Sequence, residues 1–150
     1  MNKPALAFST LTILLTAPLA SIAQTDTGAH RFLQPCLPLS VVNLLTGLSL
    51  TQSSEDGNPQ NSCSYSNSEQ LSKQSRVSYA RDSGYRVAFG ESDIMQKVTG
   101  LGNFAEFDLE GGQLYVNIGS DGLMFEGRQG KQKLSLEKLR ALAEKVLQKP

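Results

Sequence analysis

Most catalytic and metal sites need residues that are scarce in this chain. It contains no tryptophan, two cysteines and a single histidine, His30, which lies in a polar stretch near the N-terminus. One histidine gives a nucleophilic serine or cysteine no well-placed base, and two cysteines without a neighbouring histidine do not complete a zinc site. We therefore predict no catalytic residue, no metal site and no cofactor, and no motif in the sequence names an activity.

A long apolar run is also missing from most of the chain, but one occurs at its start. Residues 1–23 have the three zones of a secretory signal. Lys3 gives the charged start, residues 5–19 are uncharged and mostly apolar, and small side chains precede the cut. We predict cleavage between Ala23 and Gln24, which gives a periplasmic or secreted protein in an oxidising compartment.

Two other interpretations of this first segment are a membrane anchor and a lipoprotein signal. The apolar run is shorter than the roughly 20 residues of a spanning helix, and it contains Pro18. A lipoprotein signal places a cysteine directly after the cut, where this chain has Gln24. We expect no membrane anchor after cleavage, a flexible segment at residues 24–34 and a single domain at residues 35–150.

Charge is balanced overall but uneven along the chain. The 14 Lys and Arg residues match 14 Asp and Glu residues, so nucleic acid is not an expected partner. Residues 98–127 nevertheless hold five acidic and no basic side chains, whereas residues 128–150 hold seven basic and two acidic ones. Such segregation produces either a dipole that binds a partner or two segments that neutralise each other within the fold.

The two cysteines, Cys36 and Cys63, follow the export signal. In an oxidising compartment two cysteines usually form a disulfide, whereas a metal site or a catalytic thiol would need a histidine nearby. We predict a disulfide that closes a loop of 28 residues. By the chain-entropy model such a loop contributes about 3.5 kcal/mol to stability.

Hydrophobic spacing and capping residues predict a short helix in the first part of the domain. It is expected to begin after Ser40 as the N-cap and to end at Gly47. Its apolar face is expected to consist of Val41, Leu44, Leu45 and Leu48.

The segment that follows is predicted to contain a loop and several strands. Residues 51–62 are rich in Ser, Asn and Gln and are expected to form an exposed loop. Residues 63–65 alternate as in a strand, and residues 77–89 are expected to form a hairpin with its turn at residues 82–84. Residues 92–98 are predicted to form a short helical turn.

The last part of the chain gives the clearest pattern. Strands at residues 104–109, 114–118 and 123–126 are expected to form a meander, and the glycine-rich residues 99–103 a tight connection before it. An amphipathic helix is predicted after Ser135 as the N-cap, with an apolar stripe of Leu139, Leu142, Ala143, Val146 and Leu147. We therefore expect an α+β fold with an antiparallel sheet of about five to six strands, a short N-terminal helix and a C-terminal helix packed on one face.

Three carboxylates at alternate positions give one predicted strand an acidic face: Glu106, Asp108 and Glu110. The apolar residues between them are expected to point inward: Ala105, Phe107 and Leu109. The acidic face is then ordinary solvated surface, a face that binds a basic partner or an ion, or an acid/base pair. The tyrosines pose a similar choice between a binding surface and ordinary core or edge positions: Tyr65, Tyr79, Tyr85 and Tyr115.

Several short motifs occur in an order that is similar to a known group of proteins. A helix ends in Leu-Thr-Gly at residue 47, and Cys-Ser-Tyr follows at residues 63–65. Val-x-Gly-Leu-Gly-Asn-x-Ala begins at residue 98, and Leu-Tyr-Val-x-x-Gly at residue 114. In these motifs the chain resembles small exported bacterial domains of unknown function, best known from actinobacterial envelope lipoproteins.

The resemblance spans nearly the whole mature chain. It implies a disulfide between Cys36 and Cys63 and a sheet with flanking helices. It implies no enzyme activity and provides no catalytic residues. The chain departs from the pattern in lacking the lipid-bearing cysteine and in having Asn103 where an aspartate is usual.

The sequence favours a non-enzymatic exported protein that binds a protein or a cell-envelope component, a class that includes inhibitors and immunity-type proteins. The predicted partner-binding face is the acidic strand, with Glu106, Asp108 and Glu110. A competing hypothesis is a hydrolase of envelope polymers that uses these carboxylates as acid and base. A third is a small-ligand binder with a pocket between the sheet and the C-terminal helix.

We expect the exported protein to begin at Gln24. Mass spectrometry of the protein from the periplasm or the medium of an expressing bacterium should give the mass of residues 24–150 with a closed disulfide. A mass that retains residues 1–23, or that includes an attached lipid, would contradict the predicted cut.

Overall fold

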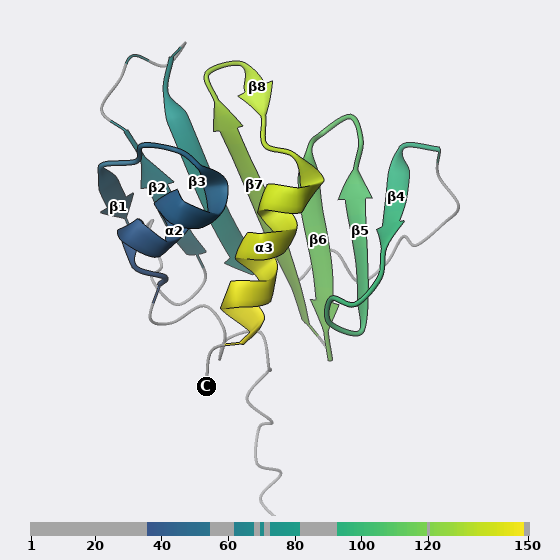
Figure 1. Cartoon of the computed structure of the whole chain (residues 1–150). Helices are drawn as coiled ribbons and strands as arrows, with labels where there is room; N and C mark the ends of the chain where they lie inside the picture. Colours follow the sequence, from purple (N-terminus) through teal and green to yellow (C-terminus); the bar gives the residue numbers. More distant parts are fainter. Residues whose placement is uncertain are drawn as a thin grey trace, which may run out of the picture.

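In the residues that the structure describes, one antiparallel sheet carries two helices on one face (Figure 1). The computed structural model describes residues 36–54, 62–67, 70, 73–81, 93–119 and 121–148. In this part of the chain eight strands pair in the order β1-β2-β3-β7-β6-β5-β4, and β8 pairs with β7. The strands are β1 (Gln52–Ser54), β2 (Ser62–Ser66), β3 (Ser75–Arg81), β4 (Met95–Val98), β5 (Phe104–Asp108), β6 (Gln113–Ile118), β7 (Asp121–Gln129) and β8 (Gln132–Lys133).

The predicted fold class, α+β with an antiparallel sheet and two helices, is confirmed, but the predicted five to six strands are too few. The strand β1 lies in the segment that was expected to be an exposed loop. The strand β4 replaces the helical turn expected at residues 92–98. Both lie at edges of the sheet and bury little: of the four residues of β4, only Val98 is buried. Edge strands are held by backbone hydrogen bonds on one side, so hydrophobic alternation does not reveal them.

The predicted meander is confirmed as β5, β6 and β7, although β7 continues to Gln129. The tight connection before it is also confirmed. Gly102 has a φ of 54°, and a Cβ atom there would lie 2.3 Å from the carbonyl oxygen of Asn117. Only glycine lets the two backbones approach this closely.

The strand β3 lies inside the sheet and pairs on both sides, with β2 and with β7. It joins a first meander, β1-β2-β3, to a second, β4-β5-β6-β7. The hairpin predicted at residues 77–89 required the next segment to pair with β3, and both edges of β3 are occupied by other strands. The second arm of that hairpin lies outside the described residues.

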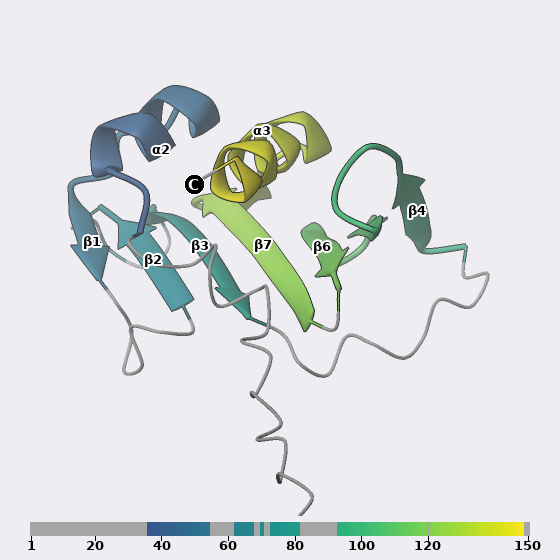
Figure 2. The same cartoon turned by 90° about the horizontal axis from the view of Figure 1, so that it is seen from below.

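The C-terminal helix α3 (Leu136–Leu147) confirms its prediction and covers the centre of the sheet (Figure 2). Ser135 stands at the N-cap with an extended backbone, although its side chain makes no capping hydrogen bond. The buried residues of α3 belong to the predicted stripe: Leu139, Leu142, Ala143 and Val146. They pack above β7 and β6, whose inward side chains are equally buried.

The first helix α2 (Leu39–Thr46) lies beside α3 and differs in detail from its prediction. It ends at Gly47, with a φ of 67°, as predicted, but its N-cap is Pro38 and not Ser40. Leu44 was expected on the buried face and is 83% exposed, whereas Val42 is fully buried. The helix is apolar on several sides, so spacing alone does not decide which side meets the sheet.

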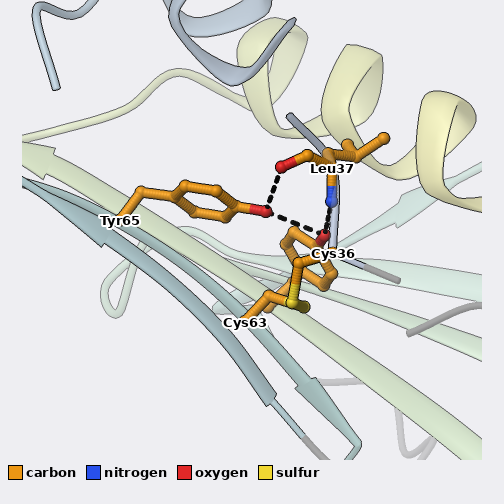
Figure 3. Close-up of a disulfide and its surroundings, with 5 residues drawn as sticks. Cys36, Leu37, Cys63 and Tyr65 are labelled. Atoms are coloured by element: carbon orange, nitrogen blue, oxygen red, sulfur yellow. Dashed lines mark hydrogen bonds between the residues drawn. A yellow bond between two sulfur atoms is a disulfide. The ribbon is translucent and has the colours of Figure 1, made fainter. Parts of the chain in front are cut away.

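The predicted disulfide is confirmed: Cys36 and Cys63 are bonded, with their Cα atoms 5.8 Å apart. It ties the chain just before α2 to the strand β2 (Figure 3). Cys63 is fully buried, so the bond is part of the core and closes the segment that contains α2 and β1.

A ring of three hydrogen bonds lies beside the disulfide (Figure 3). The Leu37 N–H donates to the Tyr79 hydroxyl (2.8 Å), and the Tyr65 hydroxyl donates to the Leu37 carbonyl (2.8 Å). The Tyr65 hydroxyl has thereby used its proton, so in the 3.1 Å contact between the two hydroxyls Tyr79 is the donor. Each group both gives and accepts a bond. Tyr65 and Tyr79 are therefore core residues that anchor the chain to the sheet.

We expect replacement of Tyr79 by phenylalanine to cost about 1–3 kcal/mol of unfolding free energy, because the buried Leu37 N–H loses its acceptor. Burial raises the pKa of the Tyr79 phenol above 10.0, against the opposing effect of its hydrogen bonds with Tyr65 and Leu37. As the pH rises, the Tyr79 phenol therefore ionises in the unfolded protein before it ionises in the folded one. The contribution of the neutral Tyr79 phenol to stability is complete below about pH 10 and falls as the pH rises further. Urea denaturation between pH 8 and pH 11 measures both effects.

The matched control is Tyr115→Phe, which removes a hydroxyl from the opposite face of the sheet. The loss of stability at high pH should be shallower in Tyr79→Phe than in the wild type or the control. Identical pH profiles for the three proteins would show that the Tyr79 hydroxyl does not anchor the chain.

Candidate functional site

Among the residues that the structure describes, no helix covers the face of the sheet opposite α2 and α3 (Figure 2), and we call it the helix-free face. Successive side chains of a strand point to opposite faces. Because Val77 and Tyr79 of β3 are buried on the helix side, Arg76 and Ser78 lie on the helix-free face. Alternation and register bring further polar side chains of β6 and β7 to this face: Gln113, Tyr115, Glu126 and Arg128.

Four of these side chains form a hydrogen-bonded polar network across the three central strands. The Ser78 hydroxyl donates to Glu126 Oε1 (2.9 Å), and Gln113 Nε2 donates to Glu126 Oε2 (3.2 Å). The Tyr115 hydroxyl donates to Gln113 Oε1 (2.8 Å). Both oxygens of the carboxylate are engaged, so the network holds Glu126 in one orientation.

Next to the network, three cations stand side by side on adjacent strands. Arg76 of β3 is directly opposite Arg128 of β7, and Arg128 is opposite Lys133 of β8. We call these three residues the cation row. Together with Glu126 and three glycines they line a cleft of 230 Å³; the glycines are Gly111, Gly112 and Gly127.

The glycines of the β5–β6 turn shape one wall of this cleft. Gly112 has a φ of 70°, and a Cβ there would lie 2.5 Å from the Cδ atom of Lys133. The stem of Lys133 therefore lies directly on the turn, and its ammonium donates to the carbonyl of Glu110. At this point the basic segment of the sequence meets the acidic one, through a backbone oxygen.

The structure separates the three carboxylates that the sequence placed on one face. Glu106 is on the helix-free face of β5 but is only 7% exposed. Asp108 caps the β5–β6 turn, where its Oδ1 accepts the N–H groups of Glu110 (2.9 Å) and Gly111 (2.7 Å). Glu110 lies beyond the end of the strand, in the turn itself.

The prediction that Leu109 points inward is wrong, because its side chain is 54% exposed. The strand β5 ends at Asp108, and alternation does not continue into a turn. The tyrosines divide between the two faces: Tyr65 and Tyr79 lie in the core, and Tyr115 lies in the polar network. Tyr85 is outside the described residues.

Sequence reasoning missed the cation row. Arg76 and Arg128 are brought together by the pairing of β3 with β7, two strands that are separated by β4, β5 and β6 in the sequence. A local signal does exist, since each arginine occupies a polar position of an alternating strand. That signal does not say which strands become neighbours, so the row was not predictable without the topology.

Comparisons of this chain with protein-family models, with curated proteins and with solved structures find no match. The resemblance to exported actinobacterial domains therefore stays a prediction. No helix in the described part of the chain is long and apolar enough to cross a bilayer. Among the residues that the structure describes, no group of three or more His, Cys, Asp or Glu side chains could hold a metal ion.

We expect Asp108→Ala to lower the unfolding free energy by about 1 kcal/mol, because two turn N–H groups lose their acceptor. The matched control is Glu110→Ala, which removes an exposed carboxylate and keeps the backbone carbonyl that Lys133 contacts. Its effect should stay within about 0.5 kcal/mol, as for most surface substitutions. Equal effects in urea denaturation would contradict the capping role of Asp108.

Proposed function

We propose that this protein is a non-enzymatic exported binding protein and that it recognises a protein or a cell-envelope component on its helix-free face. The polar network of Ser78, Gln113, Tyr115 and Glu126 carries the proposal. The network fixes four side chains on the three central strands, on the face that has no helix. A surface that is ordered before binding loses less side-chain entropy when a partner arrives.

The placement of the carboxylates favours binding over polymer hydrolysis. A glycosidase needs two carboxyl groups that face each other across the scissile bond. Glu106 is buried, Asp108 is engaged by the turn, and Glu110 lies in the turn. These placements favour the binding hypothesis over the hydrolase, and a binding role for the three residues remains a proposal.

The size of the cleft favours a large partner over a small ligand. The region between α3 and the sheet, where a ligand pocket was proposed, is filled by fully buried side chains: Leu114, Leu123, Phe125, Leu139 and Leu142. The cleft on the helix-free face measures 230 Å³, below the roughly 300–1,000 Å³ of most small-molecule sites. A cleft of this size suits one projecting group of a macromolecule.

The disulfide supports the proposed location. A bond between Cys36 and Cys63 persists in the periplasm or outside the cell. The export signal at residues 1–23 lies outside the described residues and rests on the sequence, as does the resemblance to exported domains.

The proposal is tested by affinity capture. Immobilised mature protein should retain a partner from periplasmic extract, culture medium or solubilised envelope. The double variant Gln113→Ala/Tyr115→Ala should weaken retention at least about tenfold, which corresponds to about 1.4 kcal/mol. The matched control Leu44→Ala truncates an exposed side chain on the opposite side of the molecule and should retain the partner as the wild type does.

Two results would overturn the proposal. One is that no partner is recovered from any fraction at any salt concentration. The other is a partner that is retained equally by the wild type and the double variant, because binding would then lie elsewhere on the molecule.

A further inference from the structure

The cation row places like charges directly opposite one another. Side chains at such positions of an antiparallel pair have Cβ atoms about 5 Å apart, and like charges there destabilise the sheet. Arg76 faces Arg128, and Arg128 faces Lys133. The row therefore costs stability in the isolated protein, and an anion held between the side chains would replace the repulsion by attraction.

A third arginine on the same two strands is arranged differently. Arg81 of β3 donates to Asp121 of β7 at 2.8 Å, and the Asp121 carboxylate is buried. Among the described residues, no carboxylate lies within salt-bridge distance of Arg76 or Arg128. The fold thus provides one arginine of β3 with an internal counter-ion and leaves Arg76 and Arg128 facing the cleft.

Two other side chains of the cleft are held in place. Lys133 lies across Gly112 and contacts the carbonyl of Glu110. Glu126 is held by Ser78 and Gln113. The lining of the cleft thus includes a cation that rests on the β5–β6 turn and a carboxylate that is held by two hydrogen bonds.

The number and spacing of the cations indicate the shape of the anion. A planar carboxylate is satisfied by one arginine in a bidentate pair. The cation row spans three neighbouring strands, each about 4.8 Å from the next. A tetrahedral phosphate presents oxygens in several directions and can contact all three side chains at once.

The volume of the cleft agrees with a group of this size. The cleft measures 230 Å³, several times the roughly 30 Å³ that one water molecule occupies in the liquid. That is room for one phosphate and the atoms that join it to a larger molecule.

We propose that the cleft at the cation row is a subsite for a phosphate group of the partner, bound by Arg76, Arg128 and Lys133. This inference rests on the proposed function, because it assigns the chemical class of one group that the helix-free face recognises. Glu126 also lines the cleft, and its carboxylate repels negative charge on a ligand. The site should therefore favour a phosphate diester, which carries one negative charge, over a phosphate dianion.

The probes are inorganic phosphate and dimethyl phosphate, titrated into the mature protein and followed by NMR shifts of the Gly111, Gly112 and Gly127 amides. Saturable shifts are expected with both probes, with tighter binding of the diester and weaker binding as salt is added. The double variant Arg76→Gln/Arg128→Gln should bind each probe at least tenfold more weakly.

The matched control is Lys131→Gln, which removes one positive charge from the β7–β8 turn outside the cleft lining. It should bind both probes within about twofold of the wild type. Shifts that never saturate, or equal binding by the wild type and the double variant, would overturn the inference. Acetate that binds as tightly as dimethyl phosphate would overturn the assignment to phosphate.

Thermal unfolding gives a second readout that a misfolded variant cannot imitate. Without phosphate the double variant should unfold at or above the wild-type midpoint, because the repulsion between the two arginines is gone. Phosphate should raise the midpoint of the wild type and of Lys131→Gln and leave that of the double variant unchanged. A double variant that gains as much stability from phosphate as the wild type does would contradict the site.

Vesicles distinguish a lipid headgroup from other phosphates. Binding to phosphatidylglycerol vesicles, but not to phosphatidylcholine vesicles, that is lost in the double variant supports the subsite and identifies a lipid as its source. Binding of dimethyl phosphate without vesicle binding supports the subsite and identifies a phosphate outside the membrane.

Failure of the subsite and failure of the proposed function give different results. If a partner is captured through Gln113 and Tyr115 while neither phosphate probe binds, the phosphate assignment falls and the proposed function stands. If phosphate binds at the cation row and no macromolecule is captured, the proposed function falls.

Discussion

The pairing of β3 with β7 is the constraint on which the rest of the structure depends. It joins the two meanders into one sheet and fixes which residues of the two strands face each other. On the helix side it brings Tyr79 next to Phe125, with ring centroids 5.7 Å apart. On the helix-free face it brings Ser78 to Glu126. A slip of one residue would exchange the two faces, so the core and the candidate site are specified by the same register.

The N-terminal part of the domain is attached to this sheet by two devices at one place. The disulfide connects Cys36 to β2, and the next residue, Leu37, has both of its backbone groups bonded to tyrosine hydroxyls. The second device explains why Tyr65 and Tyr79 are tyrosines although both are buried. A phenylalanine would fill the same space but leave a buried N–H or carbonyl without a partner.

The accuracy of the sequence-based predictions follows the range of the interactions. The meander β5-β6-β7 and the helix α3 follow from alternation, turns and caps, which are local, and the disulfide follows from two cysteines behind a predicted export signal. The edge strands β1 and β4 bury too few side chains to leave a hydrophobic pattern in the sequence. The helix α2 is apolar on several sides, so its sequence does not reveal which side is buried. The cation row depends on strands far apart in the sequence, so its members looked like ordinary surface residues.

The order of the strands has a consequence for how the chain folds. Ser78 and Glu126, which pair across the middle of the sheet, are 48 residues apart in the sequence. The first meander therefore has no second neighbour for β3 until β7 has been made, close to the end of the chain. Formation of such distant contacts is slow compared with local ones. The completed sheet is consequently a late event, because the strand that unites its two halves is among the last parts of the chain to be made.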